Sequence, residues 1–487
     1  MKTRVTDLFL YRWRYRLGYV FVTLVGVTVI GLIATLVPAA LREAEMQSAL
    51  TSGALSIKSL APHMVIDWPY HVLQRASFML FGVTTLSIKL PSLLIGFFTA
   101  IGIFMLVRSW FRRNIAIIVT VLAVTMTPFL FMIQDGTPTI SFTAITVWLL
   151  LAGTYVTRGA LFGTFWKVLG CVLLAISLYT PLGIYLTIAL IITASLHPHI
   201  RYVLRRIAKP RLILAVVLGL LSVAPLAYAI YLDNSVAATI FGLPKGGIDI
   251  GRNLVTAGQN MFGFFSTSDS HILRPMFSLA TTLLILIGIY KLLTVKYTAR
   301  SYAILILGTI LSIIVIVNPT YVFDMFPIVV LLVAMGITTL IVEWYKLFPR
   351  NPYARITGLI PLAVLVVGLS FSNTTNYVNS YLYNPNILAH YSHDLKIFQR
   401  ALTAQNITKD NPIKLIVTEK EKSFYDLVAH YDKRFNVSTK YDEHTAHSIA
   451  TRAVRSAHLS TIEPTLIITS KQANDADRFY LYKPIEK

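Results

Sequence analysis

Apolar and polar residues alternate along this chain in blocks rather than residue by residue. Apolar runs of about 15 to 21 residues recur through positions 1–371, and a helix needs roughly 20 residues to cross the hydrocarbon core of a bilayer. We therefore predict a mainly α-helical, polytopic transmembrane bundle with about eleven spans. The predicted spans are Leu17–Val37, Leu90–Val107, Ile115–Ile133, Ile140–Val156, Phe165–Tyr179, Leu182–Leu196, Leu212–Leu232, Met276–Leu293, Tyr302–Val317, Phe326–Val342 and Ile356–Phe371.

Two of the polar segments between these spans are long. Residues 38–89 follow the first predicted span, and residues 233–275 follow the seventh. Loops held on a rigid scaffold commonly carry the functional residues of a protein. We name these segments the first and second long loops and expect the functional site there.

The chain becomes polar after residue 371. Short apolar stretches in this part predict buried strands, and the segments between them have helical spacing. The predicted strands are Lys414–Thr418, Thr465–Thr469 and Phe479–Tyr482, and the predicted helices are Ser423–Tyr431 and Ala446–Arg455. We therefore expect two domains, a transmembrane domain over residues 1–371 and a small α/β domain over residues 372–487.

Composition and charge agree with an integral membrane protein. Hydrophobic residues make up 55% and charged residues 13% of the chain, whereas soluble proteins carry about 25% charged residues. The net charge of +21 comes largely from Lys and Arg in short loops on one side of the predicted spans, so it does not indicate a nucleic-acid partner. Because basic loops stay in the cytoplasm, we expect a cytoplasmic N-terminus and an extracytoplasmic C-terminal domain. The single cysteine, Cys171, excludes an internal disulfide and a cysteine-cluster metal site.

Four segments carry a resemblance to a known family. Leu41–Gly53 reads LREAEMQSALTSG, Asp67–Gly96 reads DWPYHVLQRASFMLFGVTTLSIKLPSLLIG, and Ser109–Pro138 ends in the turn QDGTP. The late span Pro319–Ile337 begins PTYVFDMFP. In order and spacing the series resembles the GT-C glycosyltransferases, in the branch that contains protein O-mannosyltransferases and lipid A aminoarabinose transferases.

This resemblance implies a membrane glycosyltransferase that moves a sugar from a polyprenyl-phosphate donor to an acceptor outside the cytoplasm. Its partners would be the lipid-linked sugar, membrane lipid and an acceptor that is a glycan, a lipid or a protein. The chemistry needs a carboxylate to deprotonate the acceptor hydroxyl, and cations or a divalent metal ion to stabilise the leaving phosphate. We expect the protein in a bacterial plasma membrane.

The chain departs from the family at the positions where acidic residues are expected. Depending on the alignment, Pro38–Ala40 or Arg42 and Glu43 stand in place of an Asp-Glu pair at the start of the first long loop. Thr139 stands at a second Asp position, and Thr320 at the Arg of a late Arg-Tyr pair. A catalytically inactive relative that binds lipid-linked sugar or scaffolds a partner therefore remains the alternative.

Glu43 and Glu45 are the first candidate catalytic residues, because they lie two positions apart at the mouth of the first span. A carboxylate at the edge of a low-dielectric site can act as a general base. Glu43 is preferred because it gives the nearer alignment to the family pair. The alternative is the charged face of an interfacial helix, with Arg42 as a local partner.

Asp67 and Asp135 are the second pair of candidates. Asp67 precedes Trp68 and Pro69, with His71 and Arg75 one turn later, so it could bind a metal or orient an acceptor. Equally, it could cap the helix that begins at the proline. Asp135 lies four residues before Thr139, where a shifted turn could bring its carboxylate to the missing Asp position; the alternative is a plain Asp-Gly turn.

The second long loop offers cations for phosphate. Its glycines allow close approach of a ligand to the backbone, although an ordinary loop with scattered charges is the alternative. The candidates are Lys245, Arg252, His271 and Arg274. Asp324, at the edge of the tenth predicted span, is a further acidic residue that needs a partner or interfacial water.

Overall fold

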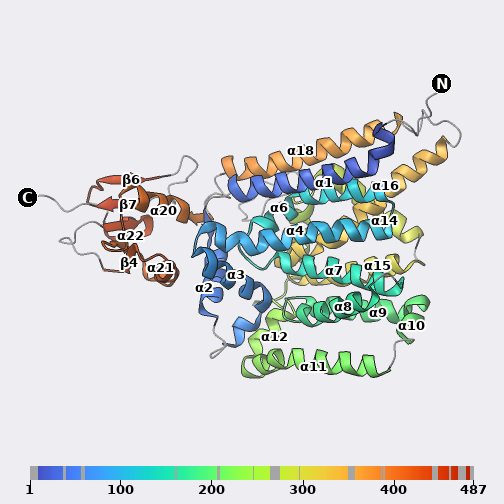
Figure 1. Cartoon of the computed structure of the whole chain (residues 1–487), viewed down its shortest axis with the longest axis horizontal. Coiled ribbons are helices and arrows are strands. Elements are labelled where there is room, and N and C mark those ends of the chain that lie inside the picture. The colour runs from blue at the N-terminus through green and yellow to red at the C-terminus, as the bar shows by residue number, and fades with distance from the viewer. Residues whose placement is uncertain are drawn as a thin grey trace, which may run out of the picture.

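The computed structural model of the chain is mainly helical (Figure 1). It describes residues 9–36, 40–55, 61–159, 162–205, 209–244, 246–263, 275–295, 297–348, 357–384, 387, 390–440, 448–459, 462–469 and 479–482. Within these residues, five helices are long and apolar enough to cross a membrane, and a sixth span results if one bent helix pair is counted. The five are α4 (Thr85–Trp110), α7 (Ile140–Thr157), α15 (Ala299–Val317), η3 with α16 (Pro319–Leu347) and α18 (Leu359–Tyr383).

Shorter apolar helices occupy the other predicted spans. They lie in α1 (Phe9–Leu36), α8 (Gly163–Ser177), α9 (Gly183–Leu196), α11 (Lys209–Leu232) and α14 (Leu279–Thr294). The helical, membrane-type architecture is therefore confirmed, while the crossing of a membrane by all eleven segments stays a prediction. The last predicted span does not end at Phe371, because α18 continues to Tyr383.

The third predicted span is broken rather than continuous. α5 (Arg113–Thr125) and α6 (Thr127–Gln134) meet at an angle of 60°. Pro128 lies in the first turn of α6 and has no amide hydrogen, and Met126 before it is extended. A proline ring disfavours helical conformation in the chain that precedes it. The bend directs α6 toward the turn that contains Asp135.

The close pair of predicted spans forms two helices, as expected from the charged segments on either side of it. α8 ends at Ser177 and α9 begins at Gly183. A Cβ atom on Gly183 would lie 1.6 Å from the carbonyl oxygen of Ser177, so only glycine fits this turn. The turn is also tied to the second long loop, because the Leu182 amide donates to the Ile240 carbonyl at 2.9 Å.

The first long loop is a compact unit rather than an open loop. It contains β1 (Leu41–Arg42), α2 (Glu43–Ala54), the 3-10 turn η2 (Pro62–Val65) and α3 (Trp68–Phe81). The second long loop contains α12 (Asn234–Ile240) and α13 (Ile250–Phe262). Figure 1 shows α2, α3 and α12 at one end of the helical bundle, whereas α10 (Pro198–Arg205) lies at the other end.

The C-terminal part forms a mixed sheet with strand order β4-β3-β5-β7-β6. β3 is parallel to β4 and β5, and β7 is antiparallel to β5 and β6. The strands are β3 (Ile413–Ile416), β4 (Phe435–Ser438), β5 (Ser448–Thr451), β6 (Leu466–Ile468) and β7 (Phe479–Tyr482), and the helices are α20 (Leu395–Ala404), α21 (Glu419–Tyr431) and α22 (Arg452–His458).

The three predicted strands of this sheet are confirmed, but the predicted helix Ala446–Arg455 is wrong in its first half. Ser448–Thr451 form the central strand β5, and all four residues are buried between β3 and β7. The helix α22 begins only at Arg452. Hydrogen bonds from both neighbouring strands outweigh the helical spacing of this short segment.

The C-terminal part is joined to the first long loop by a strand pair and an apolar cluster. β1 pairs antiparallel with β2 (Tyr391–His393), with Arg42 opposite Tyr391. Leu41 and Phe78 of the loop are buried in one hydrophobic cluster with residues of α20, α21 and the sheet. The first long loop therefore lies between the bundle and the sheet (Figure 1).

Phe78 tests this packing. The side chain is fully buried and faces Tyr431 of α21 at a ring distance of 6.4 Å. Phe78→Ala should lower the free energy of unfolding by about 3–5 kcal/mol, because it removes apolar packing and leaves a cavity. It should also expose the C-terminal part to limited proteolysis. Phe81→Ala on the same helix is the matched control, since 62% of Phe81 is exposed; equal effects of both substitutions would contradict the packing.

Candidate functional site

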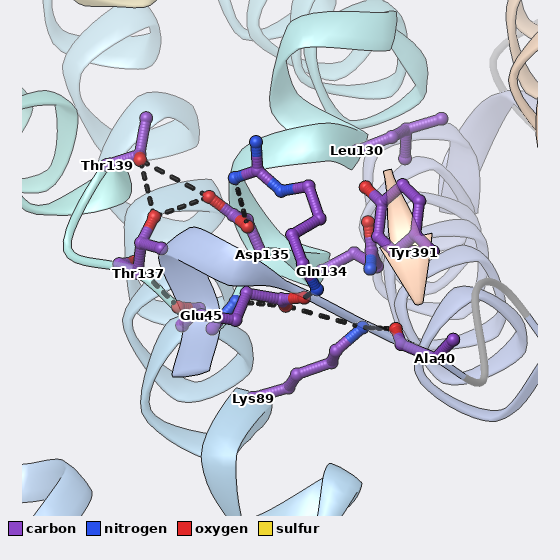
Figure 2. A network of polar contacts seen from close by, with 12 residues as sticks. Ala40, Glu45, Lys89, Leu130, Gln134, Asp135, Thr137, Thr139 and Tyr391 are labelled. Atoms are coloured by element: carbon purple, nitrogen blue, oxygen red, sulfur yellow. Dashed lines mark hydrogen bonds and ion pairs between the residues drawn. The ribbon is translucent and has the colours of Figure 1, made fainter. Parts of the chain in front are cut away.

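Glu45 lies at the centre of a buried polar network at the end of the bundle. It is the third residue of α2, and its Oε2 accepts the Arg42 amide hydrogen at 2.8 Å, which forms half of a capping box. Its Oε1 accepts the Gly136 amide hydrogen at 2.7 Å and lies 3.4 Å from Lys89 Nζ. Burial raises the pKa of Glu45, and the charge of Lys89 opposes that rise. Figure 2 shows Glu45 and Lys89 facing each other, with Ala40 beside the ammonium group.

Asp135 is the second carboxylate of this network. It ends α6, and its Oδ1 accepts from Arg42 Nη2 at 2.6 Å. Its Oδ2 accepts from the Thr137 hydroxyl, and the Thr139 hydroxyl lies 3.4 Å away (Figure 2). The carboxylate therefore does lie beside Thr139, as the shifted-turn interpretation expects. The turn is buried, because only 1% of Asp135 is exposed.

Arg42 connects the two carboxylates. Its backbone amide binds Glu45 and its guanidinium binds Asp135. Burial acts to lower the pKa of Arg42, but the charge of Asp135 raises it above its ordinary value. The sequence placed Arg42 as a partner of the neighbouring glutamates and did not anticipate this ion pair, which spans 93 residues.

Lys89 is a functional candidate that the sequence analysis missed. It lies in the first turns of α4, and its side chain is 7% exposed. Its Nζ also reaches the Ala40 carbonyl at 3.5 Å. An ionisable residue at the start of an apolar helix is itself a signal of a functional site, because burying an unpaired charge is costly.

Asp67 belongs to a second, neighbouring cluster. It precedes α3, but its side chain makes no capping hydrogen bond, so the capping interpretation is wrong for the carboxylate. The carboxylate instead bonds to Thr180, and Oδ1 has no partner within the described residues. Burial raises the pKa of Asp67 to about 7. Its backbone is left-handed, with φ 51° and ψ 27°, a strained conformation for a residue other than glycine.

The first long loop, the turn between α8 and α9, and η3 meet around Asp67. Its amide donates to the Tyr179 carbonyl at 2.8 Å, in the turn between α8 and α9. Asp324, buried in η3, lies close enough to interact electrostatically with Asp67. η3 is joined to the second long loop, because Asn318 Nδ2 donates to the Gly242 carbonyl at 3.0 Å. The second long loop therefore bonds to two segments that lie beside Asp67, η3 and the turn between α8 and α9.

Tyr70 stands between the two clusters. Its hydroxyl lies 2.8 Å from Ser92 Oγ, which in turn donates to the Thr137 carbonyl. Burial raises the pKa of Tyr70, with further contributions from the charges of Asp135, Glu45 and Asp67. One buried side chain thus lies within electrostatic reach of three carboxylates, which makes the two clusters a single candidate site.

His71 bonds to α2, through Ser52. Its Nδ1 lies 2.8 Å from Ser52 Oγ, and burial lowers its pKa to about 4, so the ring is neutral at pH 7. Ser52 also donates to Gln74, whose Nε2 donates to the carbonyls of Ile88 and Gly136. These bonds hold α2, α3 and the turn after α6 together. Among the described residues, no three His, Cys, Asp or Glu side chains form a group that could hold a metal ion.

The remaining sequence candidates lie elsewhere. Glu43 is exposed at the start of α2, and Arg252 is exposed on α13, where its amide donates to Asp249. Lys245, His271 and Arg274 lie outside the described residues. Their proposed roles in binding phosphate therefore stay predictions.

The C-terminal part contributes Tyr391 to the site, which the sequence did not predict. Its hydroxyl lies 3.0 Å from that of Tyr381 in α18. Tyr377, one turn earlier in the same helix, donates to Gln134 at 2.9 Å. These residues connect β2 and α18 to the end of α6, next to Asp135.

The fold is shared with solved membrane proteins. The structure matches ArnT from Cupriavidus metallidurans bound to undecaprenyl phosphate, with a TM-score of 0.52 and 12% identity over 96% of this chain and 97% of that one. The expected GT-C fold is confirmed. No protein-family model matches the chain, and no curated protein sequence does.

A second match is the Archaeoglobus fulgidus oligosaccharyltransferase in the apo form, with a TM-score of 0.51 and 10% identity. It covers 88% of this chain, which spans only 65% of that protein. The same archaeal enzyme, AglB, in complex with an inhibitory peptide and a dolichol-phosphate matches with a TM-score of 0.50 and 11% identity over 92% of this chain and 70% of that one. At these identities the likeness establishes the fold.

The pair Glu45–Lys89 gives a testable prediction. Lys89→Met leaves a buried carboxylate without its ammonium partner and should lower the free energy of unfolding by about 3–5 kcal/mol. The double variant Glu45→Gln/Lys89→Met should recover part of this loss, because the uncompensated charge is gone. Thermal unfolding in detergent measures both. Lys346→Met is the matched control: its pair with Glu343 is exposed and should leave Tm unchanged. A double variant that is no more stable than Lys89→Met would contradict the ion pair.

Proposed function

We propose that this protein is a membrane glycosyltransferase that moves a sugar from a polyprenyl-phosphate donor to an acceptor outside the cytoplasm. The shared fold supports the proposal, because ArnT is bound to undecaprenyl phosphate and AglB to a dolichol-phosphate in the matched structures. The observation that carries it is Asp67: a buried carboxylate without a basic partner among the described residues, beside a network that holds two cations.

Asp67 is the proposed general base. A base works best when its pKa lies near the operating pH, and the pKa of Asp67 is raised to about 7. Its carboxylate would take the proton of the acceptor hydroxyl as that oxygen bonds to the anomeric carbon of the donor sugar. The bond from this carbon to the phosphate oxygen then breaks, and its electron pair leaves with the polyprenyl phosphate. The strained backbone at Asp67 agrees with a functional role.

Arg42 and Lys89 are the proposed stabilisers of the leaving phosphate. Cations held in place in a low-dielectric site stabilise developing negative charge without reorganisation. The 18% exposure of the Arg42 side chain supports an approach of the phosphate to its guanidinium. Arg252, Lys245, His271 and Arg274 are proposed as further phosphate ligands from the second long loop. The isoprenoid tail would lie against the apolar helices, as its chemistry requires.

The proposed setting is a bacterial plasma membrane, with the N-terminus in the cytoplasm and the C-terminal domain outside. The arrangement of the chain supports it: both long loops and the C-terminal sheet lie at one end of the bundle, and the basic loop around α10 lies at the other (Figure 1).

A catalytically inactive protein that binds lipid-linked sugar is the second candidate function. One specific observation favours it: Glu45 and Asp135, two of the candidate catalytic residues, are both paired with cations of the same chain. Binding of a labelled polyprenyl-phosphate sugar, measured beside transfer, separates the two functions. Binding without product supports the inactive protein.

Asp67→Asn tests the proposed base. Loss of a general base should reduce the transfer rate by about 10²-fold or more. Asparagine tolerates the left-handed conformation and keeps a side-chain acceptor, so the fold should survive. Glu43→Gln is the comparison, because Glu43 was the base preferred from the sequence. A large loss in Glu43→Gln together with normal transfer by Asp67→Asn would move the base to Glu43.

The pH dependence gives an independent check. The base must be ionised, so the transfer rate should rise as pH increases through about 7 and then level off. Stability should change in the opposite direction. The folded carboxyl binds its proton more tightly than the unfolded one, whose pKa is about 3.8, so the free energy of unfolding falls as pH rises from about 4 to 7. Asp67→Asn should flatten both dependences, and unchanged profiles in this variant would contradict the assignment.

A further inference from the structure

The network around Glu45 and Asp135 is complete without an added cation. Each of the four carboxylate oxygens has a donor: the amides of Arg42 and Gly136 for Glu45, and Arg42 Nη2 and the Thr137 hydroxyl for Asp135. Lys89 adds an ammonium group 3.4 Å from Glu45 Oε1. A divalent metal ion binds through such oxygens, and here it would have to share every one of them with a hydrogen-bond donor.

The charges of these side chains also disfavour a metal ion at this site. The two carboxylates face one guanidinium and one ammonium group, so the four side chains are neutral together. The carboxylates are almost fully buried, and the two cations are 18% and 7% exposed. A metal ion at this place would add two positive charges next to two existing ones in a poorly solvated site, which is strongly unfavourable.

Arg42 is the residue that closes the site to metal. It stands at one of the positions where the family resemblance predicts an acidic residue, and its guanidinium lies 2.6 Å from Asp135. The guanidinium is permanently charged, and it binds Asp135 through a single bond from Nη2 to Oδ1. The chain therefore has a cation at a position where the resemblance predicts an acidic residue.

We propose that Arg42, with Lys89, takes the place of a divalent metal ion at this site, so that sugar transfer proceeds without one and removal of the guanidinium creates a metal site from Asp135 and Glu45. The claim that sugar transfer proceeds without a metal ion rests on the proposed function. The claim about metal binding does not, because it can be tested whether or not the protein transfers a sugar.

Mn²⁺ binding to the purified full chain in detergent tests the inference. After dialysis against chelator, electron paramagnetic resonance should detect less than about 0.1 equivalent of Mn²⁺ bound to the unmodified protein at a millimolar concentration. Arg42→Gln should bind about one equivalent saturably, because Asp135 then lacks its cation. Arg42→Lys keeps the charge and should not bind. Asp135→Asn combined with Arg42→Gln should abolish the gained site, and Arg112→Gln, at an exposed arginine of the α4–α5 connection, is the matched control.

Saturable Mn²⁺ binding to the unmodified protein that Asp135→Asn removes would overturn the inference, and so would a folded Arg42→Gln protein that binds no Mn²⁺. Size-exclusion profiles show whether each variant is folded. If Arg42→Gln misfolds, Mn²⁺ binding to the unmodified protein still tests whether the site is closed to metal. Transfer that is lost on chelation and restored by Mn²⁺ would overturn the inference while leaving the proposed function intact. Absence of transfer under all conditions, with no Mn²⁺ bound, would defeat the proposed function alone.

Discussion

The arrangement of this protein depends on the need to neutralise two carboxylates that it buries. Glu45 and Asp135 are almost fully buried, and each is matched by a cation from a different segment. A buried carboxylate that loses its partner is strongly destabilising, so the segments that carry these charges must meet in one geometry. They are the start of the first long loop, the first turns of α4 and the turn after α6. The ion pairs thereby fix the loop on the bundle and build the candidate site in the same step.

The C-terminal sheet takes part in this arrangement. Strand β2, which lies before this sheet in the chain and forms a separate pair with β1, places Tyr391 opposite Arg42. The buried face of the first long loop packs against α20, α21 and the sheet itself. Arg42 is therefore held twice: its guanidinium by Asp135 from the bundle, and its backbone by strand pairing with the C-terminal part.

Asp67, in contrast to Glu45 and Asp135, is buried without a cation beside it among the described residues. It has no basic partner among the described residues, and its raised pKa reflects the cost of its ionised form in a poorly solvated place. Structural carboxylates are usually paired, as Glu45 and Asp135 are here. We therefore propose different roles for these carboxylates. Glu45 and Asp135 hold cations in position, whereas Asp67, which has no cation partner among the described residues, can accept a proton.

The sequence alone determined the helical, membrane-type architecture, because apolar runs of span length allow few other structures, and it determined most strands of the C-terminal sheet through their apolar stretches. It also singled out Glu45, Asp67 and Asp135. It could not determine which charges pair, because Arg42 and Asp135 are 93 residues apart and local patterns carry no information on such contacts. For the same reason it missed Lys89 and Tyr391, and it predicted a helix at β5. Only the tertiary structure decided these points, since the energy of a buried charge or a central strand is set by neighbours that come from distant parts of the chain.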